Sequence, residues 1–179
     1  MVIEKYGVVL KRLTQDKIEM VRVWRNSPSI SQFMEYRETI TPEMQREWFK
    51  KINNDKNFYF IINYDSKEIG LINLKDVDYI NKVAECGIFI YEKDFLNSTI
   101  SIRSTLTICD YAFEYLKLDS IITHVLSDNK NAITYNKFFG SILEPNQEMV
   151  YNQRYVRKRE DYYKRREKIL KMLNLTDKS

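Results

Sequence analysis

The opening of the chain changes from an alternating to a helical spacing of its apolar residues. "YGVVLKRL" alternates apolar and polar positions, which predicts a strand from Tyr6 to Leu13. Asp16 can then cap a helix in which Val21 and Trp24 share one face. The residue before a proline avoids helical geometry, so this helix should end ahead of Pro28.

A second helix has a clearer start. Thr41 can cap it, and Pro42 suits its first position, where the missing N–H has no helical partner to lose. Its helical spacing predicts a buried side made of Met44, Trp48, Phe49 and Ile52.

The remaining pattern predicts strands and helices in alternation. "NFYFIINYD" and "KEIGLINLKDVD" flank the turn Asp65-Ser66-Lys67 and predict a hairpin, and "KVAECGIFIYE" predicts the next strand. The helix "SIRSTLTICDYAFEYLKL", the strand "SIITHVLS" and the helix "NKNAITYNKFFG" follow, with Gly140 as the last helix's C-terminal cap. A hairpin and a basic helix complete an α/β (α+β) fold with a mixed sheet. We expect one domain over 1–179, with a core of about 6–160 and the basic helix at about 161–175.

Composition narrows the class of protein. The 179 residues are 44% apolar and 30% charged, as in an ordinary soluble domain, and no apolar run reaches the roughly 18 residues of a membrane span. Glu4 and Lys5 come too early for a signal peptide, so a cytoplasmic location is expected. Cys86 and Cys109 are expected to be buried reduced thiols, and with one histidine no metal site is predicted.

Positive charge gathers near the C-terminus. The net charge is +4, yet the segment from Arg154 to Lys171 holds nine Lys/Arg and three Asp/Glu, or +6, which leaves −2 for the rest. Such a segment can bind nucleotide phosphate or nucleic acid, or it can be a solvated strand and helix.

The hinge "DFLNSTIS" joins a predicted strand to a predicted helix and contains no glycine. A helix N-terminus presents unpaired N–H groups and a partial positive charge whatever its side chains, so it can bind phosphate. Asn97, Ser98, Thr99 and Ser101 are small polar residues that can donate to a phosphate, or they can simply cap the helix. Arg103 adds a cation one turn later.

Five strings in order resemble the Gcn5-related N-acetyltransferases: "VWRNSPSISQFM", "ITPEMQREWFKKI", "AECGIFIY", "YAFEYLKLDSI" and "SDNKNAITYNKFFG". The similarity runs from about Val8 to Glu144. It is greatest to the branch with ribosomal-protein-alanine acetyltransferases and a nucleotide-sugar acetyltransferase of pseudaminic acid synthesis. It implies a mostly antiparallel sheet flanked by helices, an acetyl-coenzyme A cosubstrate and no metal.

The resemblance also implies where coenzyme A binds. Its pyrophosphate is expected on Ser98, Thr99, Ile100, Ser101, Ile102 and Arg103. The family's two glycines are absent, because Ser101 and Arg103 stand in their places. The pantetheine arm is expected on the backbone of Phe89, Ile90 and Tyr91, and on Asn129, Ala132 and Asn136.

Two residues are candidates for the chemistry. Glu85 can deprotonate an ammonium directly or through water, since only the neutral amine attacks; otherwise it is a surface strand residue. The family's thiolate-protonating tyrosine falls on Asn136, beside Tyr135. One residue is about 100° of helix rotation, so Tyr135 either approaches the thiolate or faces the core.

The predicted acceptor contacts are Trp24, Arg25, Asn26, Met34 and His124. Trp24 also fits a core position, and His124 also fits a structural role. The sequence therefore predicts an acetyl-coenzyme-A-dependent N-acetyltransferase acting on a nucleotide-linked amino sugar, without membrane or nucleic-acid partners and compatible with a homodimer. The alternatives are an acetyltransferase for a protein N-terminus or a polyamine, and a non-catalytic binding module.

Overall fold

An eight-stranded sheet forms the centre of the computed structural model, which describes residues 1–96 and 98–177. The strand order is β1-β2-β3-β4-β5-β6-β8-β7, and neighbours are antiparallel except for the parallel pair β5 and β6. This is the mixed, mostly antiparallel sheet that the sequence predicted. The strands are β1 Val2–Lys5, β2 Val8–Arg12, β3 Phe58–Tyr64, β4 Lys67–Asp78, β5 Val83–Ile90, β6 Ser120–Leu126, β7 Ile142–Leu143 and β8 Asn152–Lys158.

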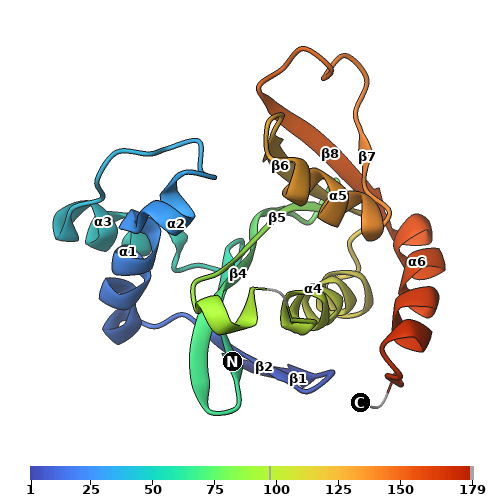
Figure 1. Ribbon diagram of the computed structural model, residues 1–179, viewed down its shortest axis with the longest axis horizontal. Helices are drawn as coiled ribbons and strands as arrows, with labels where there is room; N and C mark the ends of the chain where they lie inside the picture. Colours follow the sequence, from blue (N-terminus) through green and yellow to red (C-terminus); the bar gives the residue numbers. More distant parts are fainter. Residues whose placement is uncertain (97, 178–179) are drawn as a thin grey trace.

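Helices cover the sheet on both sides. The first three group on one side, whereas α4 and α6 lie on the other (Figure 1). No helix of the described residues has the length and apolar character needed to cross a membrane. The helices are α1 Ile18–Asn26, α2 Pro28–Ser31, α3 Pro42–Ile52, α4 Ile100–Asp110 with a π-helical turn at Tyr111–Tyr115, α5 Lys130–Phe138 and α6 Arg159–Met172.

The strand predicted from Tyr6 to Leu13 is found as β2, and an unpredicted strand, β1, precedes it and completes a hairpin. Tyr6 and Gly7 both have positive φ angles, 56° and 73°, and they turn the chain between β1 and β2. A tyrosine rarely adopts this conformation, which is why Tyr6 and Gly7 were predicted to belong to the strand and not to a turn before it. Here the Tyr6 side chain is fully buried, and its burial compensates the backbone cost.

Capping predictions were partly confirmed. The Thr41 side chain accepts a hydrogen bond from the Met44 N–H and so caps α3, and Asp65 turns the predicted hairpin with a positive φ. Asp16 does not cap α1, because it lies in a 3-10 turn ahead of that helix.

The prediction that Met44 lies on the buried side of α3 was wrong. Met44 is 41% exposed, and Gln45 is buried in its place.

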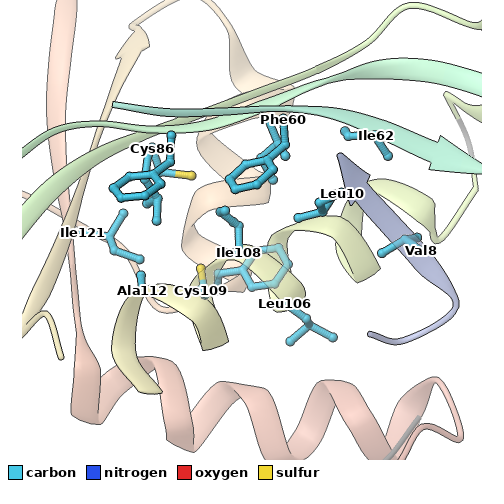
Figure 2. Close-up of a cluster of buried hydrophobic side chains, with 14 of the residues drawn as sticks. Val8, Leu10, Phe60, Ile62, Cys86, Leu106, Ile108, Cys109, Ala112 and Ile121 are labelled. Atoms are coloured by element: carbon cyan, nitrogen blue, oxygen red, sulfur yellow. The ribbon is translucent and has the colours of Figure 1, made fainter. Parts of the chain in front are cut away.

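The larger core lies between the sheet and α4. In Figure 2, Ile108, Cys109 and Ala112 of α4 approach Phe60 and Cys86 from the strands. Both thiols are buried and reduced, as the sequence predicted.

The smaller core lies on the opposite face, where α1 and α3 cover the sheet. Trp24, Phe49, Tyr59 and Leu71 belong to this cluster. The sheet is therefore covered on both faces at its centre.

The basic C-terminal helix begins slightly earlier than predicted, at Arg159, and it is not simply solvated. Arg166 is 5% exposed, and its guanidinium binds Asp110 at 2.8 and 3.0 Å. Asp110 also accepts hydrogen bonds from Lys5, Tyr6 and Tyr162. This Asp110 network fixes α6 against α4 and the first hairpin.

Candidate active site

The parallel strands β5 and β6 separate soon after they meet. Only three residue pairs join them in the described chain: Val83–Ser120, Ala84–Ile121 and Glu85–Ile122. Beyond Glu85, β5 stays paired with β4, and beyond Ile122, β6 stays paired with β8. The two strands therefore leave a divergence between them, with backbone groups that no ladder between β5 and β6 satisfies.

Glu85 lies at the start of this divergence. Its carboxylate is 3.0 Å from Nζ of Lys75, and its other oxygen is 3.2 Å from Nδ1 of His124. The Glu85 side chain is 22% exposed to solvent and the His124 side chain is 34% exposed. A carboxylate held between two nitrogen donors yet open to solvent can take up a proton and pass it on.

Sequence reasoning placed Glu85 and His124 in different roles and did not see that they meet. Their contact follows from register: Glu85 pairs with Ile122, and His124 is the next β6 residue on the same face. Lys75, opposite Glu85 in β4, was missed altogether. Only the strand register could have revealed it.

Arg25 lies in the last turn of α1, above the smaller core. Its Nε is buried and has no hydrogen-bond partner within the described chain, and burial lowers the pKa of its guanidinium. Burial likewise raises the pKa of Tyr59 to about 12. The negative charge of Glu85 adds to this increase, and the positive charge of Arg25 opposes it. Arg25 and Glu85 therefore both lie within electrostatic reach of Tyr59.

Asn73 joins these residues and was not predicted. It stands between Tyr59 of β3 and Gly87 of β5 in the strand register, and its buried Oδ1 lacks a partner among the residues that the structure describes. A Cβ at Gly87 would lie 3.2 Å from the Asn73 amide nitrogen. The absence of a side chain at Gly87 leaves this amide accessible from β5.

The other predicted acceptor residues have structural contacts. Trp24 stacks on Tyr91 with ring centroids 5.4 Å apart, so it belongs to the core. The Asn26 side chain donates to the Ile40 carbonyl and accepts from its N–H, both at 2.9 Å. Asn26 therefore anchors the loop after α2 rather than presenting a free amide.

The α2–α3 loop, residues 32–41, reaches the β7–β8 region. Glu35 accepts a hydrogen bond from Asn152 at 3.0 Å, and Arg37 donates to the Tyr151 hydroxyl at 2.9 Å. Met34, half-buried, belongs to this loop. The loop thus connects the α1 side of the sheet with the far side of the divergence, a connection that no local pattern predicts.

The hinge forms a helix start as expected. The Thr99 side chain makes no capping hydrogen bond, and Ser98 Oγ accepts from the Ile100 N–H at 3.3 Å. In an α-helix the next N–H groups, those of Ser101 and Ile102, have no intrahelical partner. Within residues 1–96 and 98–177 these two N–H groups are therefore open to an anion, while Asn97 lies outside the described residues.

Arg103 is less free than the sequence indicated. Its Nη1 donates to the Tyr6 carbonyl at 3.0 Å and its Nε to Thr99 Oγ1 at 3.2 Å. It therefore holds α4 against the first hairpin, and only its remaining N–H groups can reach a ligand.

On α5, Asn129 caps the helix and Tyr135 faces α4. The Asn129 side chain accepts from the Ala132 N–H at 3.0 Å. The Tyr135 hydroxyl donates to the Ser101 carbonyl at 2.7 Å and lies 2.8 Å from Thr105 Oγ1, and burial raises its pKa. Asn136 is buried and accepts a hydrogen bond from Arg157.

The backbone residues predicted for the pantetheine arm follow Glu85 along β5. Phe89 and Tyr91 contribute side chains to the smaller core, whereas Ile90 contributes to the larger one. The Tyr91 N–H is already bonded to the Ile69 carbonyl at 2.8 Å. Phe89 and Ile90 therefore lie along the divergence, and Tyr91 marks its far end.

Comparison with known proteins identifies acetyltransferases both by family and by individual relatives. The family described as "Acetyltransferase (GNAT) domain" matches residues 8–136. Acetyltransferase PseH of Campylobacter jejuni is 32% identical over 123 residues, which are 68% of this chain and 74% of that protein.

Solved structures share the fold. Apo FdhC, described as a nucleotide-linked sugar GNAT, superposes with a TM-score of 0.80 at 18% identity, covering 97% of this chain and 98% of that one. The spermidine N-acetyltransferase of Vibrio cholerae in complex with CoA and spermine gives 0.76 at 21% identity, covering 88% and 98%. At these identities the likeness concerns the fold alone.

Proposed function

Because the chain belongs to the Gcn5-related N-acetyltransferase family, and is an acetyltransferase, we propose that it transfers the acetyl group of acetyl-coenzyme A to the amine of a nucleotide-linked amino sugar. The reaction would occur where β5 and β6 diverge, with Glu85 at the attacking amine.

The observation that carries the acceptor assignment is the unpartnered Arg25. Its buried Nε and the buried Oδ1 of Asn73 lack partners in the described residues, on the same side of the sheet as Glu85. A guanidinium can bind a phosphate through two parallel hydrogen bonds. A phosphate would accept a hydrogen bond from the Arg25 Nε–H, and a hydroxyl or N–H of the sugar would donate to Asn73 Oδ1. A polyamine could donate to Asn73 but offers no anion to Arg25.

The residues that would hold coenzyme A fit an anionic ligand. The open N–H groups of Ser101 and Ile102 would receive the pyrophosphate, with help from the helix dipole. Phe89, Ile90, Asn129 and Ala132 would border the pantetheine arm. When bound, acetyl-coenzyme A supplies an acetyl carbonyl activated as a thioester.

Glu85 would accept the proton of the attacking amine. Lys75 and His124 hold its carboxylate in place, and the partial exposure of His124 provides a route for the proton to solvent. Positioned general bases of this kind contribute about 10²–10⁴ to rate.

A polyamine acceptor is the second candidate, because the spermidine enzyme of Vibrio cholerae shares the fold. Polyamine recognition needs unpaired carboxylates beside the amine. Glu85 is paired with Lys75 and His124, and Glu35 is bonded to Asn152, so the residues described around the divergence favour this acceptor less.

An Arg25→Lys variant tests the proposed function. Lysine keeps the charge but loses the bidentate geometry, so KM for a UDP-linked 4-amino sugar should rise about tenfold while KM for acetyl-coenzyme A stays nearly constant. Arg46→Lys changes an exposed helix arginine that pairs with Glu43; it is the matched control and should change neither constant.

A panel of amines decides between the acceptors. UDP-linked amino sugars should turn over, and spermidine and alanine-terminated peptides should react poorly. Better turnover of spermidine or of the peptides would replace the sugar assignment.

A further inference from the structure

Arg157 of β8 is buried beside the larger core although its side chain ends in a cationic guanidinium. Its side chain is 1% exposed. Nη1 donates to Sγ of Cys109 at 3.0 Å, Nη2 donates to Oδ1 of Asn136 at 3.3 Å, and the guanidinium carbon lies 5.1 Å from the Phe139 ring centroid. Within residues 1–96 and 98–177 it forms no ion pair, and its buried Nε has no hydrogen-bond partner.

The titratable groups around Arg157 do not neutralise it. Burial raises the pKa of the Cys109 thiol, that of Cys86 to about 12, and that of the Tyr135 hydroxyl, although the charge of Arg157 opposes each shift. All three groups are therefore uncharged near neutral pH. Glu85 is adjacent to Cys86 in sequence, but strand alternation places it on the opposite face of the sheet.

Arg157 lies on the face of the sheet that α4 and α5 cover, at the strand position just before β5 and β6 diverge. Arg157 stands opposite Ile121 in the β6–β8 register, and Thr123 is the next β6 residue on the same face. Thr123 is also the first β6 residue beyond the last β5–β6 pair, and its buried Oγ1 has no partner in the described part of the chain. A cation whose Nε is unpartnered and a hydroxyl that is unpartnered, both within the described residues, therefore lie at the start of the divergence on the side of α4 and α5.

Burying an unpaired charge costs free energy, so a buried unpaired arginine indicates that a ligand supplies the compensating charge. Enzymes place such fixed charges where negative charge develops during the reaction. In acetyl transfer from a thioester, that charge develops on sulfur.

We infer that Arg157, together with the Thr123 hydroxyl, stabilises the coenzyme A thiolate that leaves during acetyl transfer. This inference rests on the proposed function. The amine lone pair forms a bond to the acetyl carbon, the carbon–sulfur bond breaks with its electron pair on sulfur, and the amine proton goes to Glu85. The thiolate forms beside a charge already in place, so no acid has to protonate it as it leaves.

The contacts of Tyr135 agree with a thiolate that leaves without being protonated by this tyrosine. Its hydroxyl donates to the Ser101 carbonyl and contacts Thr105, so its proton is already used between α5 and α4. Asn136, where the resemblance places the family's tyrosine, holds the guanidinium of Arg157 instead.

The test compares coenzyme A with S-methyl-coenzyme A, which cannot ionise at sulfur. Isothermal titration calorimetry measures both affinities between about pH 6.5 and about pH 9, a range that spans the ordinary thiol pKa. The affinity of the wild-type protein for coenzyme A, relative to the thioether, should rise about tenfold, which corresponds to a bound-thiol pKa lowered by about one unit. The thioether cancels any titration of Glu85, His124 or the phosphates.

Two variants remove the charge in different ways. Arg157→Met replaces an unpaired buried ion with an apolar side chain of similar length, a change that proteins often tolerate. Asn136→Asp leaves Arg157 in place but gives it a carboxylate partner. Both should abolish the pH-dependent preference, whereas Arg154→Met, an arginine of the same strand paired with Glu144, should retain it.

The outcomes separate the two proposals. If wild-type protein binds both compounds with a constant ratio across the pH range, the thiolate role of Arg157 is overturned and the proposed function stands. If neither compound binds, both proposals fail.

Discussion

Two arginines of the C-terminal segment are almost equally buried, yet their surroundings differ in kind. Arg166 contacts Asp110 and Asp177, and it donates to the Tyr6 hydroxyl at 2.6 Å. Arg157 contacts a thiol and an amide and leaves its Nε unpartnered among the residues described. A buried charge whose partners are complete belongs to the architecture, whereas one whose partners are missing is available for a ligand.

Breaking the complete network should have the largest effect. Asp110→Asn keeps the shape of the side chain but leaves Arg166 and Lys5 without a buried counter-charge, so the free energy of unfolding should fall by about 3–5 kcal/mol. Urea denaturation measures the loss. The control is Glu114→Gln, whose half-exposed carboxylate lies 3.8 Å from Lys5 and 4.0 Å from Arg166; this change should cost less than about 1 kcal/mol.

The same network predicts that the free energy of unfolding falls at acidic pH. Burial alone would raise the pKa of Asp110, but hydrogen bonds, chiefly from Arg166 and Lys5, outweigh it and hold the pKa below its ordinary value. The stabilisation is therefore complete above about pH 4, the unfolded pKa, and is lost as pH falls through the folded pKa. In Asp110→Asn the decrease that Asp110 contributes at acidic pH should be absent. An unfolding free energy with the same pH dependence in the variant and the wild type would contradict the assignment.

Glu85→Gln should have the next largest effect, on turnover rather than stability. We expect kcat/KM to fall about 10²-fold near neutral pH, and by less at high pH where the free amine is abundant. Unfolding curves should stay close to wild type because Glu85 is partly exposed. A loss of activity independent of pH would assign Glu85 a structural role.

A smaller effect is expected at the start of α4. Ser101→Pro removes an N–H that has no helical partner, in a turn where proline is tolerated, so affinity for coenzyme A should fall about tenfold through one lost charge-assisted hydrogen bond. Ser101→Gly keeps the N–H and should bind nearly as well as wild type. Equal affinities for the two variants would show that the pyrophosphate binds elsewhere.

Local chemistry made much of the fold predictable. The Thr41-Pro42 helix start and the Asp65-Ser66 turn depend on adjacent residues, and each is found as predicted. Gly140, with a φ of 87°, follows α5 and ends it, as a glycine at this place should. The Tyr6 turn failed because its positive φ is compensated by burial against residues far along the chain.

The candidate site was predictable as a set of positions, but not as a set of contacts. Glu85 and His124 were both named, yet only the β5–β6 register brings them to 3.2 Å. Arg157 and Arg166 were counted in a basic segment that was expected either to bind phosphate or to be solvated, and neither alternative foresaw their burial, because the residues that bury them come from α4 and α5. A charge count along the sequence cannot distinguish an exposed arginine from a buried one.

The Asp110 network also has a consequence for the order of folding. Arg166 donates to the Tyr6 hydroxyl within it, and these two residues are separated by 160 positions in the chain. β1 to β6 are sheet neighbours in sequence order, so hairpins can add one after another during synthesis. Asp110, Lys5 and Tyr6 instead remain without their guanidinium until α6 has left the ribosome. A nascent chain that has formed most of the sheet would therefore hold Asp110 paired with Lys5 alone, and the last helix to be synthesised would complete the network and convert that intermediate into the stable protein.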